Sequence, residues 1–139
     1  MKELVFETGL VTYSLNGKCE VSFNPTDSDF VERLFNTFDT LDKRQEKYRD
    51  RISKEPDNRK VFEISREMDA EMREIIDGVF GVSICENLFG KMNVYSYADG
   101  LPVWANLFLA IMDEIDTTFA REQKATNARI KKYTDKYRK

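Results

Sequence analysis

The sequence predicts an α+β fold that is mainly α: an N-terminal β-hairpin or small antiparallel sheet, then three long helices and a short one packed as a bundle. Three observations support this. Residues 3–23 have the pattern of β-strands, residues 25–125 repeat apolar side chains at helical spacing, and Gly and Pro separate the segments. We expect a single domain over residues 1–139, with a hairpin region at 1–24, a helical bundle at 25–125 and a basic C-terminal tail at 126–139.

The hairpin alternates in polarity on either side of a turn signal at Asn16 and Gly17. A two-residue loop would pair residue 13 with residue 20 and leave both faces mixed. A three-residue loop, with a type I turn over residues 15–16 and Gly17 in a bulge, pairs 13 with 19 and 11 with 21. We expect the second register, because a shift of one residue inverts burial. It collects four residues on one face: Val11, Tyr13, Cys19 and Val21.

The bundle region begins at a capping box, because Thr26 is followed three residues later by Asp29. A second helix is expected over about residues 59–80 and a short one over 83–89, each ended by a glycine. A third long helix should begin at Pro102, and helix is expected to resume around 130–137. The inward faces should consist of Phe30, Leu34, Phe38, Leu41, Tyr48 and Ile52, then Val61, Ile64, Met68, Met72, Ile75 and Val79, and finally Trp104, Leu107, Phe108, Ile111, Ile115 and Phe119.

Charge is distributed unevenly along the chain. Residues 121–139 carry eight basic and two acidic side chains, and residues 1–120 carry 14 and 23, so the two parts have net charges of +6 and −9. A chain with this asymmetry can dock head to tail with copies of itself or offer its tail to an acidic partner. The total charge of −3 favours neither nucleic acid nor a membrane as a partner.

The residue types available for chemistry are few. The chain has no histidine, and Cys19 and Cys85 are isolated from each other. No signal-peptide pattern opens the sequence, and no apolar run approaches the roughly 20 residues that a membrane span needs. We therefore expect a cytoplasmic protein with buried thiols, without a cofactor and without catalytic residues.

Two pairs of carboxylates give the main enzymatic alternative. Glu71 and Glu74 are three residues apart on the second long helix, and Asp113 and Asp116 have the same spacing on the third. Four carboxylates on facing helices can hold Mg²⁺ together with substrate phosphates. This arrangement resembles that of all-α nucleotide pyrophosphohydrolases of the MazG and dimeric dUTPase type, in which an ExxE motif is followed by an ExxD motif. The chain departs from their pattern, since its second motif begins with Asp113 and no basic cluster lies nearby in the sequence.

The basic tail supports a further alternative, a nucleic-acid-binding regulator. Arg129, Lys132 and Tyr133 combine cations with an aromatic ring, a mixture that can bind phosphate backbones and stack on bases. Ile130, Tyr133 and Tyr137 also fall at helical spacing, which suits packing against the bundle or a partner groove. We favour a protein contact over nucleic acid, with a solvated terminus as the remaining interpretation.

The chain resembles the tail assembly chaperones of phages and prophages of Gram-positive gut bacteria. The likeness spans nearly the whole chain and is carried by the order of its parts and by two segments, FVERLFNTFDTLDKRQEKY and DGLPVWANLFLAIMDEIDTTFAREQKATNARIKKYTDKYRK. The resemblance implies a small, helical, non-enzymatic protein of the bacterial cytoplasm. It also implies binding to the tape measure protein, to tail tube subunits or to both during virion assembly, and frequent self-association.

A chaperone of an amphipathic helix needs an apolar groove. We expect the third long helix to line that groove wherever its apolar stripe exceeds what the core uses. Arg129, Lys132 and Tyr133 would supply a second contact based on charge. The expected groove residues are Trp104, Leu107, Phe108 and Ile111.

Overall fold

The computed structural model describes residues 1–125 and 127–137, so Thr126, Arg138 and Lys139 of the expected tail lie outside the described residues. The fold is α+β and mainly α, as predicted. Its elements in chain order are β1 (Val11–Leu15), β2 (Cys19–Phe23), α1 (Ser28–Lys54), α2 (Asn58–Phe80), α3 (Cys85–Phe89), β3 (Tyr97–Ala98), β4 (Leu101–Pro102), α4 (Val103–Lys124) and α5 (Ala128–Tyr137).

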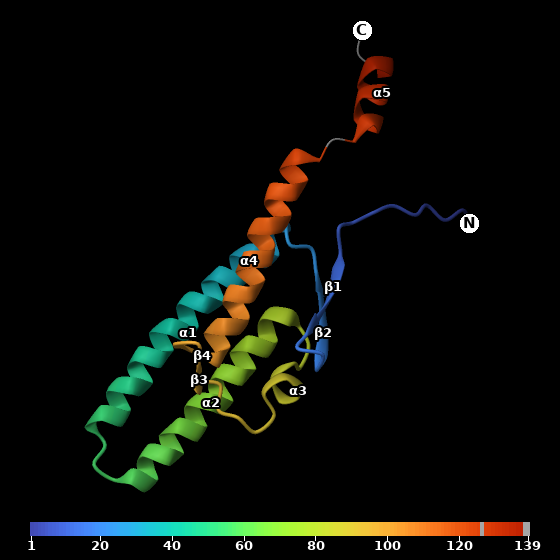
Figure 1. Cartoon of the computed structure of the whole chain (residues 1–139). Coiled ribbons are helices and arrows are strands. Elements are labelled where there is room, and N and C mark those ends of the chain that lie inside the picture. The colour runs from blue at the N-terminus through green and yellow to red at the C-terminus, as the bar shows by residue number, and fades with distance from the viewer. Residues whose placement is uncertain (126, 138–139) are drawn as a thin grey trace.

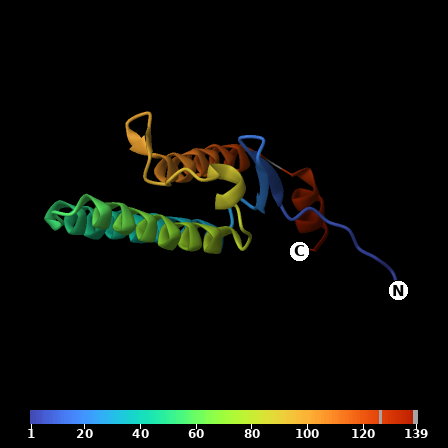
Figure 2. The same cartoon turned by 90° about the horizontal axis from the view of Figure 1, so that it is seen from below.

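Two helical layers form the body of the molecule (Figure 1, Figure 2). α1 and α2 pack against each other as an antiparallel pair, and α4 forms the second layer in contact with α1. The antiparallel β1–β2 hairpin covers one end of these layers, and both the N-terminal segment and α5 project beyond that end. In the part of the chain that the structure describes, no helix is both long enough and apolar enough to cross a membrane.

The core between the layers is centred on Trp104 and Phe108 of α4, which are 2% and 0% exposed. The Trp104 ring meets Phe38 of α1 with a centroid distance of 5.3 Å and Phe108 edge-on at 5.9 Å. Its indole N–H donates a buried hydrogen bond of 2.9 Å to Oε1 of Gln45. Because a buried indole N–H without an acceptor is costly, this bond explains why α1 buries a glutamine among apolar residues.

Aromatic stacking joins the β1–β2 hairpin to the helices. Tyr13 stacks on Phe23 at a centroid distance of 4.7 Å, and Phe23 stacks on Phe30 of α1 at 4.3 Å. The Tyr13 hydroxyl donates to Oε1 of Glu114 on α4 at 3.1 Å. The hairpin therefore contacts both helical layers, which fixes its position at the end of the bundle.

The register of the hairpin differs from the expected one by two residues. Tyr13 pairs with Val21 rather than with residue 19, and residue 11 pairs with residue 23 rather than with 21. Asn16 and Gly17 have φ values of 54° and 68°. Both residue types accept the left-handed conformation that hairpin turns favour, so the turn forms there and not over residues 15–16. A shift of two residues leaves every side chain on the same face of the hairpin, because side chains alternate between the faces with a period of two. The four expected residues therefore still share one face, and Val21 on that face is buried.

The N-terminal segment is not a strand, although the sequence pattern predicts one from residue 3. Residues 1–10 have no regular secondary structure. Leu4, Val5 and Phe6 are 82%, 86% and 78% exposed. A strand is stable only when its backbone groups are paired, and in this chain pairing begins at Val11.

The N-cap of α1 is Asp27 and not Thr26. The Asp27 carboxylate accepts a hydrogen bond from the N–H of Asp29 at 3.1 Å. The Thr26 hydroxyl instead donates to Oδ1 of Asn24 at 2.8 Å. The expected capping box is therefore not formed, because α1 begins at Ser28 and Thr26 lies one residue before the N-cap.

Most residues predicted to face inward are buried, whereas Phe38, Ile52 and Val61 are half-buried. Near the C-terminal end of α2, Ile76 is buried and the predicted Ile75 is only half-buried. On α4 Thr118 is buried, whereas Phe119 is 38% exposed. Gly81 ends α2 in the left-handed conformation with a φ of 68°, which glycine adopts without strain.

Replacing Gln45 with Met should lower the free energy of unfolding by about 1–3 kcal/mol, because the Trp104 indole N–H loses its acceptor in the core. Urea denaturation followed by tryptophan fluorescence measures this change. Lys47→Met, an exposed position on the same helix, should change it by less than about 0.5 kcal/mol. A loss equal to that of the control would contradict the assigned bond.

Candidate functional site

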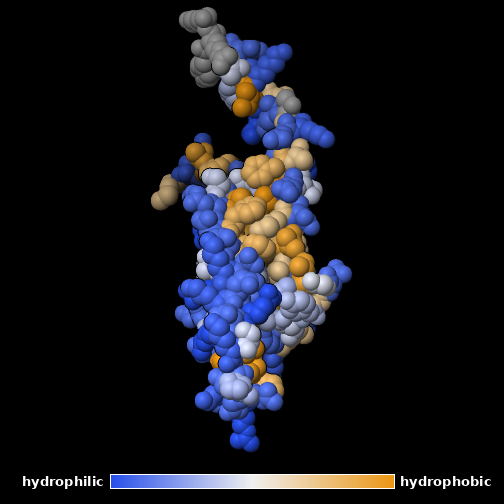
Figure 3. All heavy atoms as spheres, turned by 90° about the vertical axis from the view of Figure 1, so that its left-hand side faces the viewer, coloured by the Kyte–Doolittle hydropathy of each residue, from blue (hydrophilic) through white to orange (hydrophobic). Residues whose placement is uncertain are grey.

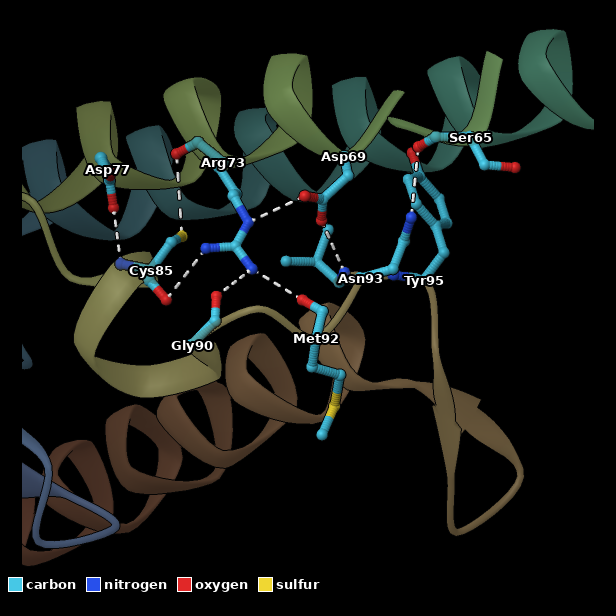
Figure 4. Close-up of polar contacts among 10 residues, drawn as sticks. Ser65, Asp69, Arg73, Asp77, Cys85, Gly90, Met92, Asn93 and Tyr95 are labelled. Carbon is cyan, nitrogen blue, oxygen red and sulfur yellow. Dashed lines mark hydrogen bonds and ion pairs between the residues drawn. The ribbon is translucent and has the colours of Figure 1, made fainter. Parts of the chain in front are cut away.

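A row of charged residues on α2 organises the connection between α2 and α4. Asp69, Arg73 and Asp77 are spaced four residues apart, so they lie along one face of the helix. Figure 4 shows this face turned toward the residues that follow α2, including α3. We call these three residues the α2 polar row. Each member binds a different part of the connection.

Arg73 is the centre of the α2 polar row. Its Nε pairs with Oδ2 of Asp69 at 3.0 Å. Its Nη2 donates to the carbonyl oxygens of Gly90 and Met92 at 2.8 Å and 2.6 Å, and its Nη1 donates to that of Cys85 at 3.4 Å (Figure 4). A guanidinium can make these bonds together because its N–H groups form a rigid fork. One side chain thus holds α3 and the residues after it against α2.

Asp77 fixes the start of α3. Its Oδ1 accepts hydrogen bonds from the N–H groups of Ile84 and Cys85 at 2.9 Å and 3.0 Å. The first N–H groups of a helix have no partner within the helix itself. Asp77 supplies that partner from α2, which satisfies the N–H groups of two residues that are each only 1% exposed.

Asp69 and Ser65 hold the segment that leads to α4. Oδ1 of Asp69 accepts from the N–H of Val94 at 2.8 Å, and the carbonyl oxygen of Ser65 accepts from the Asn93 side chain at 3.2 Å. The carbonyl oxygen of Val94 in turn accepts from the N–H of Trp104 at 3.2 Å. The position at which α4 begins is therefore linked to the α2 polar row through two consecutive hydrogen bonds.

An apolar groove lies where this connection meets the hairpin turn and the outer side of α4. Its volume is about 570 Å³. Met92 at this groove is 51% exposed, and Ala110 of α4 is exposed. We call this apolar groove the α4 groove. Its lining residues are Ser14, Leu15, Asn16, Lys18, Leu88, Phe89, Met92, Ala98, Val103, Asn106, Leu107 and Ala110.

The predicted groove residues are mostly taken up by the core. Trp104, Phe108 and Ile111 are 2%, 0% and 4% exposed, so they are not available to a partner. The expectation that they line a groove is corrected, because α1 covers this face of α4. Leu107 is 9% exposed and lines the α4 groove. The apolar surface available to a partner therefore lies beside the predicted stripe.

The four carboxylates of the enzymatic alternative do not come together. Glu71 forms an ion pair with Arg44 and accepts a hydrogen bond from the Tyr48 hydroxyl. Glu74, Asp113 and Asp116 are exposed. Over residues 1–125 and 127–137, no group of three or more His, Cys, Asp or Glu side chains is arranged to hold a metal ion. The four-carboxylate Mg²⁺ site of the enzymatic alternative is therefore not assembled among the described residues.

The predicted tail contacts are exposed on α5. The Lys132 ammonium lies 5.6 Å from the centroid of the Tyr133 ring, and Arg129 donates from Nε to Oδ1 of Asn127 at 3.4 Å. α5 lies beyond the C-terminal end of α4 (Figure 1). The structure thus brings Arg129, Lys132 and Tyr133 together on one short helix, but it separates them from Trp104.

Two buried polar groups lie next to the α2 polar row. Burial, followed by the charge of Asp77, raises the pKa of the Cys85 thiol, and the thiol contacts the Arg73 carbonyl oxygen at 3.7 Å. Burial also raises the pKa of Tyr95, whose hydroxyl oxygen has no hydrogen-bond partner among the described residues. Raised pKa values keep both groups neutral near pH 7. Neither group is activated as a nucleophile.

Sequence reasoning missed the α2 polar row. The available signal was the spacing of Asp69, Arg73 and Asp77 at four-residue intervals on a helix whose other side is apolar. Acidic and basic residues at this spacing also occur on solvated helix faces as ordinary ion pairs. Only the path of the following chain distinguishes the two cases, because the partners of the row are mostly backbone groups.

Replacing Arg73 with Met should lower the free energy of unfolding by about 2–3 kcal/mol, because charged hydrogen bonds to three carbonyl oxygens and to Asp69 are lost. Hydrogen exchange at the amides of Val94 and Cys85 should become faster, since the connection is no longer held. Arg73→Lys should recover only part of the loss, because an ammonium lacks the fork. Arg66→Met, at an exposed α2 position, is the matched control, and equal effects of the two Met variants would contradict the assignment.

The two thiols should react at different rates. Cys85 is buried and Cys19 is half-buried, and burial raises the pKa of both thiols. A raised pKa lowers the thiolate fraction at a given pH, and Cys85 also needs local opening to be reached. Alkylation at pH 8 of the native protein should therefore be at least about a hundredfold slower at Cys85 than at Cys19. In urea the rates should converge, and similar native rates would show that Cys85 is accessible.

Three surface features of the described residues suit the binding of an apolar partner. They are the α4 groove, the exposed N-terminal segment around Val5, and α5 with its basic and apolar side chains. The groove is the most constrained of the three, because the α2 polar row fixes part of its lining. No protein-family model matches the chain, and no curated protein and no solved structure matches it.

Proposed function

We propose that the protein is a non-enzymatic chaperone that binds an apolar helical face of a partner chain during phage tail assembly. The α4 groove is the observation that supports this best, because amphipathic helices lay their apolar faces into grooves of this kind. The resemblance to tail assembly chaperones supplies the partner: the tape measure protein, with tail tube subunits as a second partner class. Such a protein acts in the cytoplasm of the bacterial host.

The composition of the groove suits a helix rather than a charged ligand. Eight of its twelve lining residues are apolar, and Lys18 is its single charged residue. Asn106 donates from Nδ2 to the carbonyl oxygen of Ala98 at 2.8 Å, which holds β3 beside α4. Part of the lining is thus ordered before a partner arrives. Such pre-organisation lowers the entropy cost of binding.

The N-terminal segment supplies a second apolar surface. Leu4, Val5 and Phe6 are consecutive and largely exposed. Contiguous exposed apolar residues mark interaction sites, and an extended segment with unpaired backbone groups can add a strand to a partner. A chaperone that covers a long apolar chain benefits from more than one such contact, because linked contacts raise the overall affinity.

Met92→Glu and Ala110→Glu should each reduce co-purification of the tape measure protein at least about tenfold. A charge placed in an apolar interface must be desolvated, and a tenfold loss needs only about 1.4 kcal/mol. Both positions are exposed, so folding should be retained, and far-ultraviolet circular dichroism checks this. The measurement is affinity capture of tape measure protein co-expressed with the tagged chain.

Phe62→Glu is the matched control. Phe62 is 62% exposed on α2 and does not line the α4 groove, so this variant should retain the tape measure protein at the wild-type level. The proposal is wrong if the wild-type chain captures neither the tape measure protein nor tail tube subunits. It is also wrong if the groove variants bind as well as Phe62→Glu.

A further inference from the structure

The face of α4 that points away from the core carries two exposed carboxylates, those of Asp113 and Asp116. Leu109, Asp113, Asp116 and Ala120 are exposed and follow one another at intervals of three or four residues, so they form a stripe along the helix. Among the described residues, neither Asp113 nor Asp116 takes part in an ion pair. We call these four residues the α4 outer stripe.

Exposed apolar side chains lie within and next to the α4 outer stripe. Leu109 of the stripe and Phe119, the sequence neighbour of Ala120, are 37% and 38% exposed. Figure 3 shows an apolar band on the side of the molecule where α1 and α4 meet. The stripe therefore combines negative charge with accessible apolar surface, which is the composition of a site for a basic amphipathic segment.

α5 carries a surface of the complementary kind. Ile130 and Tyr133 are 68% and 49% exposed, and together with Arg129 they line an apolar hollow of about 480 Å³. The helix contains four basic residues and one acidic residue. Arg129 and Lys132 are in no ion pair with another described residue. Apolar and positive groups thus face solvent together on a helix that the bundle does not cover.

The two surfaces of one chain do not meet. α5 lies past the C-terminal end of α4 and points away from the body (Figure 1), whereas the α4 outer stripe runs back along the helix from residue 120 to 109. The stripe is therefore open to the α5 of another chain. The charges of the whole sequence agree with such a contact, since residues 121–139 carry +6 and residues 1–120 carry −9.

From these observations we propose that α5 of one copy docks on the α4 outer stripe of a second copy. Arg129 and Lys132 pair with Asp113 and Asp116, while the exposed apolar residues of the two helices pack together. The contact uses different surfaces on the two copies, so it can repeat and produce a ring or an open chain of molecules. It does not use the α4 groove, so it can be tested and can fail independently of the proposed function.

The test reverses the charge on each side separately. The first variant, Arg129→Glu with Lys132→Glu, keeps the wild-type stripe but has an α5 that this stripe repels. The second variant, Asp113→Lys with Asp116→Lys, keeps the wild-type α5 but has a stripe that repels it. Sedimentation velocity at about 0.01–1 mM protein covers the weak association expected of a ten-residue helix.

The wild-type protein should show a mass that rises with concentration in low salt and falls toward the 16.3 kDa of one chain at about 0.5 M salt. Each variant alone should associate at least tenfold more weakly than the wild type. An equimolar mixture of the two variants should regain association, because the α5 of the second variant fits the stripe of the first and the reversed α5 of the first fits the reversed stripe of the second. A chain carrying all four substitutions should regain association, since both charges are reversed.

Three results would overturn the proposal. The first is a wild-type protein that stays monomeric at 1 mM in low salt. Docking of α5 on its own chain would give this monomeric result and would equally contradict the proposal. The second is association that neither pair of charge reversals weakens. The third is a mixture that associates no better than the separate variants. Phe62→Glu, at an exposed position outside both surfaces, should associate as the wild type does.

Discussion

The structure depends on the ion pair between Arg73 and Asp69, because these two side chains bind the backbone of the connection between α2 and α4. That connection contains the five-residue helix α3 and two-residue strands, none of which is stable alone. Yet it must set the start of α4 and place Met92 beside the groove. Apolar packing buries Ile84, but it cannot satisfy the polar groups of the backbone. The Arg73 guanidinium donates to the carbonyl oxygens and the carboxylates of α2 accept from the N–H groups, so the connection acquires one path.

The long helices could be predicted from the sequence because their apolar spacing reports directly on the core. The same reasoning placed Trp104 at a partner surface, since periodicity shows that a helix face is apolar but not which chain covers it. Here α1 covers it, and the indole is bound to Gln45. The sequence predicted which hairpin residues share a face but not which residues pair, because a shift of two residues changes the pairs and leaves each side chain on the same face. The α2 polar row escaped prediction for another reason: its partners are backbone groups of an irregular segment.

Burial of the Trp104 face moves the surface available to partners to other parts of the chain. One side of α4 builds the core, Leu107 borders the α4 groove, and the side opposite the core carries Asp113 and Asp116. These surfaces differ in chemistry: one is apolar and nearly uncharged, and the other is acidic with an apolar border. A single helix therefore presents three faces of different chemistry, and Leu107 is the residue that both packs in the core and lines the α4 groove.

The central claim is that the α4 groove receives an apolar helix of the tape measure protein. Site-specific photo-crosslinking tests it most directly, with p-benzoylphenylalanine placed at position 92 in the groove or at position 62 on α2 during co-expression. Position 92 should yield a crosslink that mass spectrometry locates on the apolar face of a tape measure helix, and position 62 should yield none. Capture of the tape measure protein without any crosslink from position 92, or with crosslinks from position 62 alone, would contradict the account.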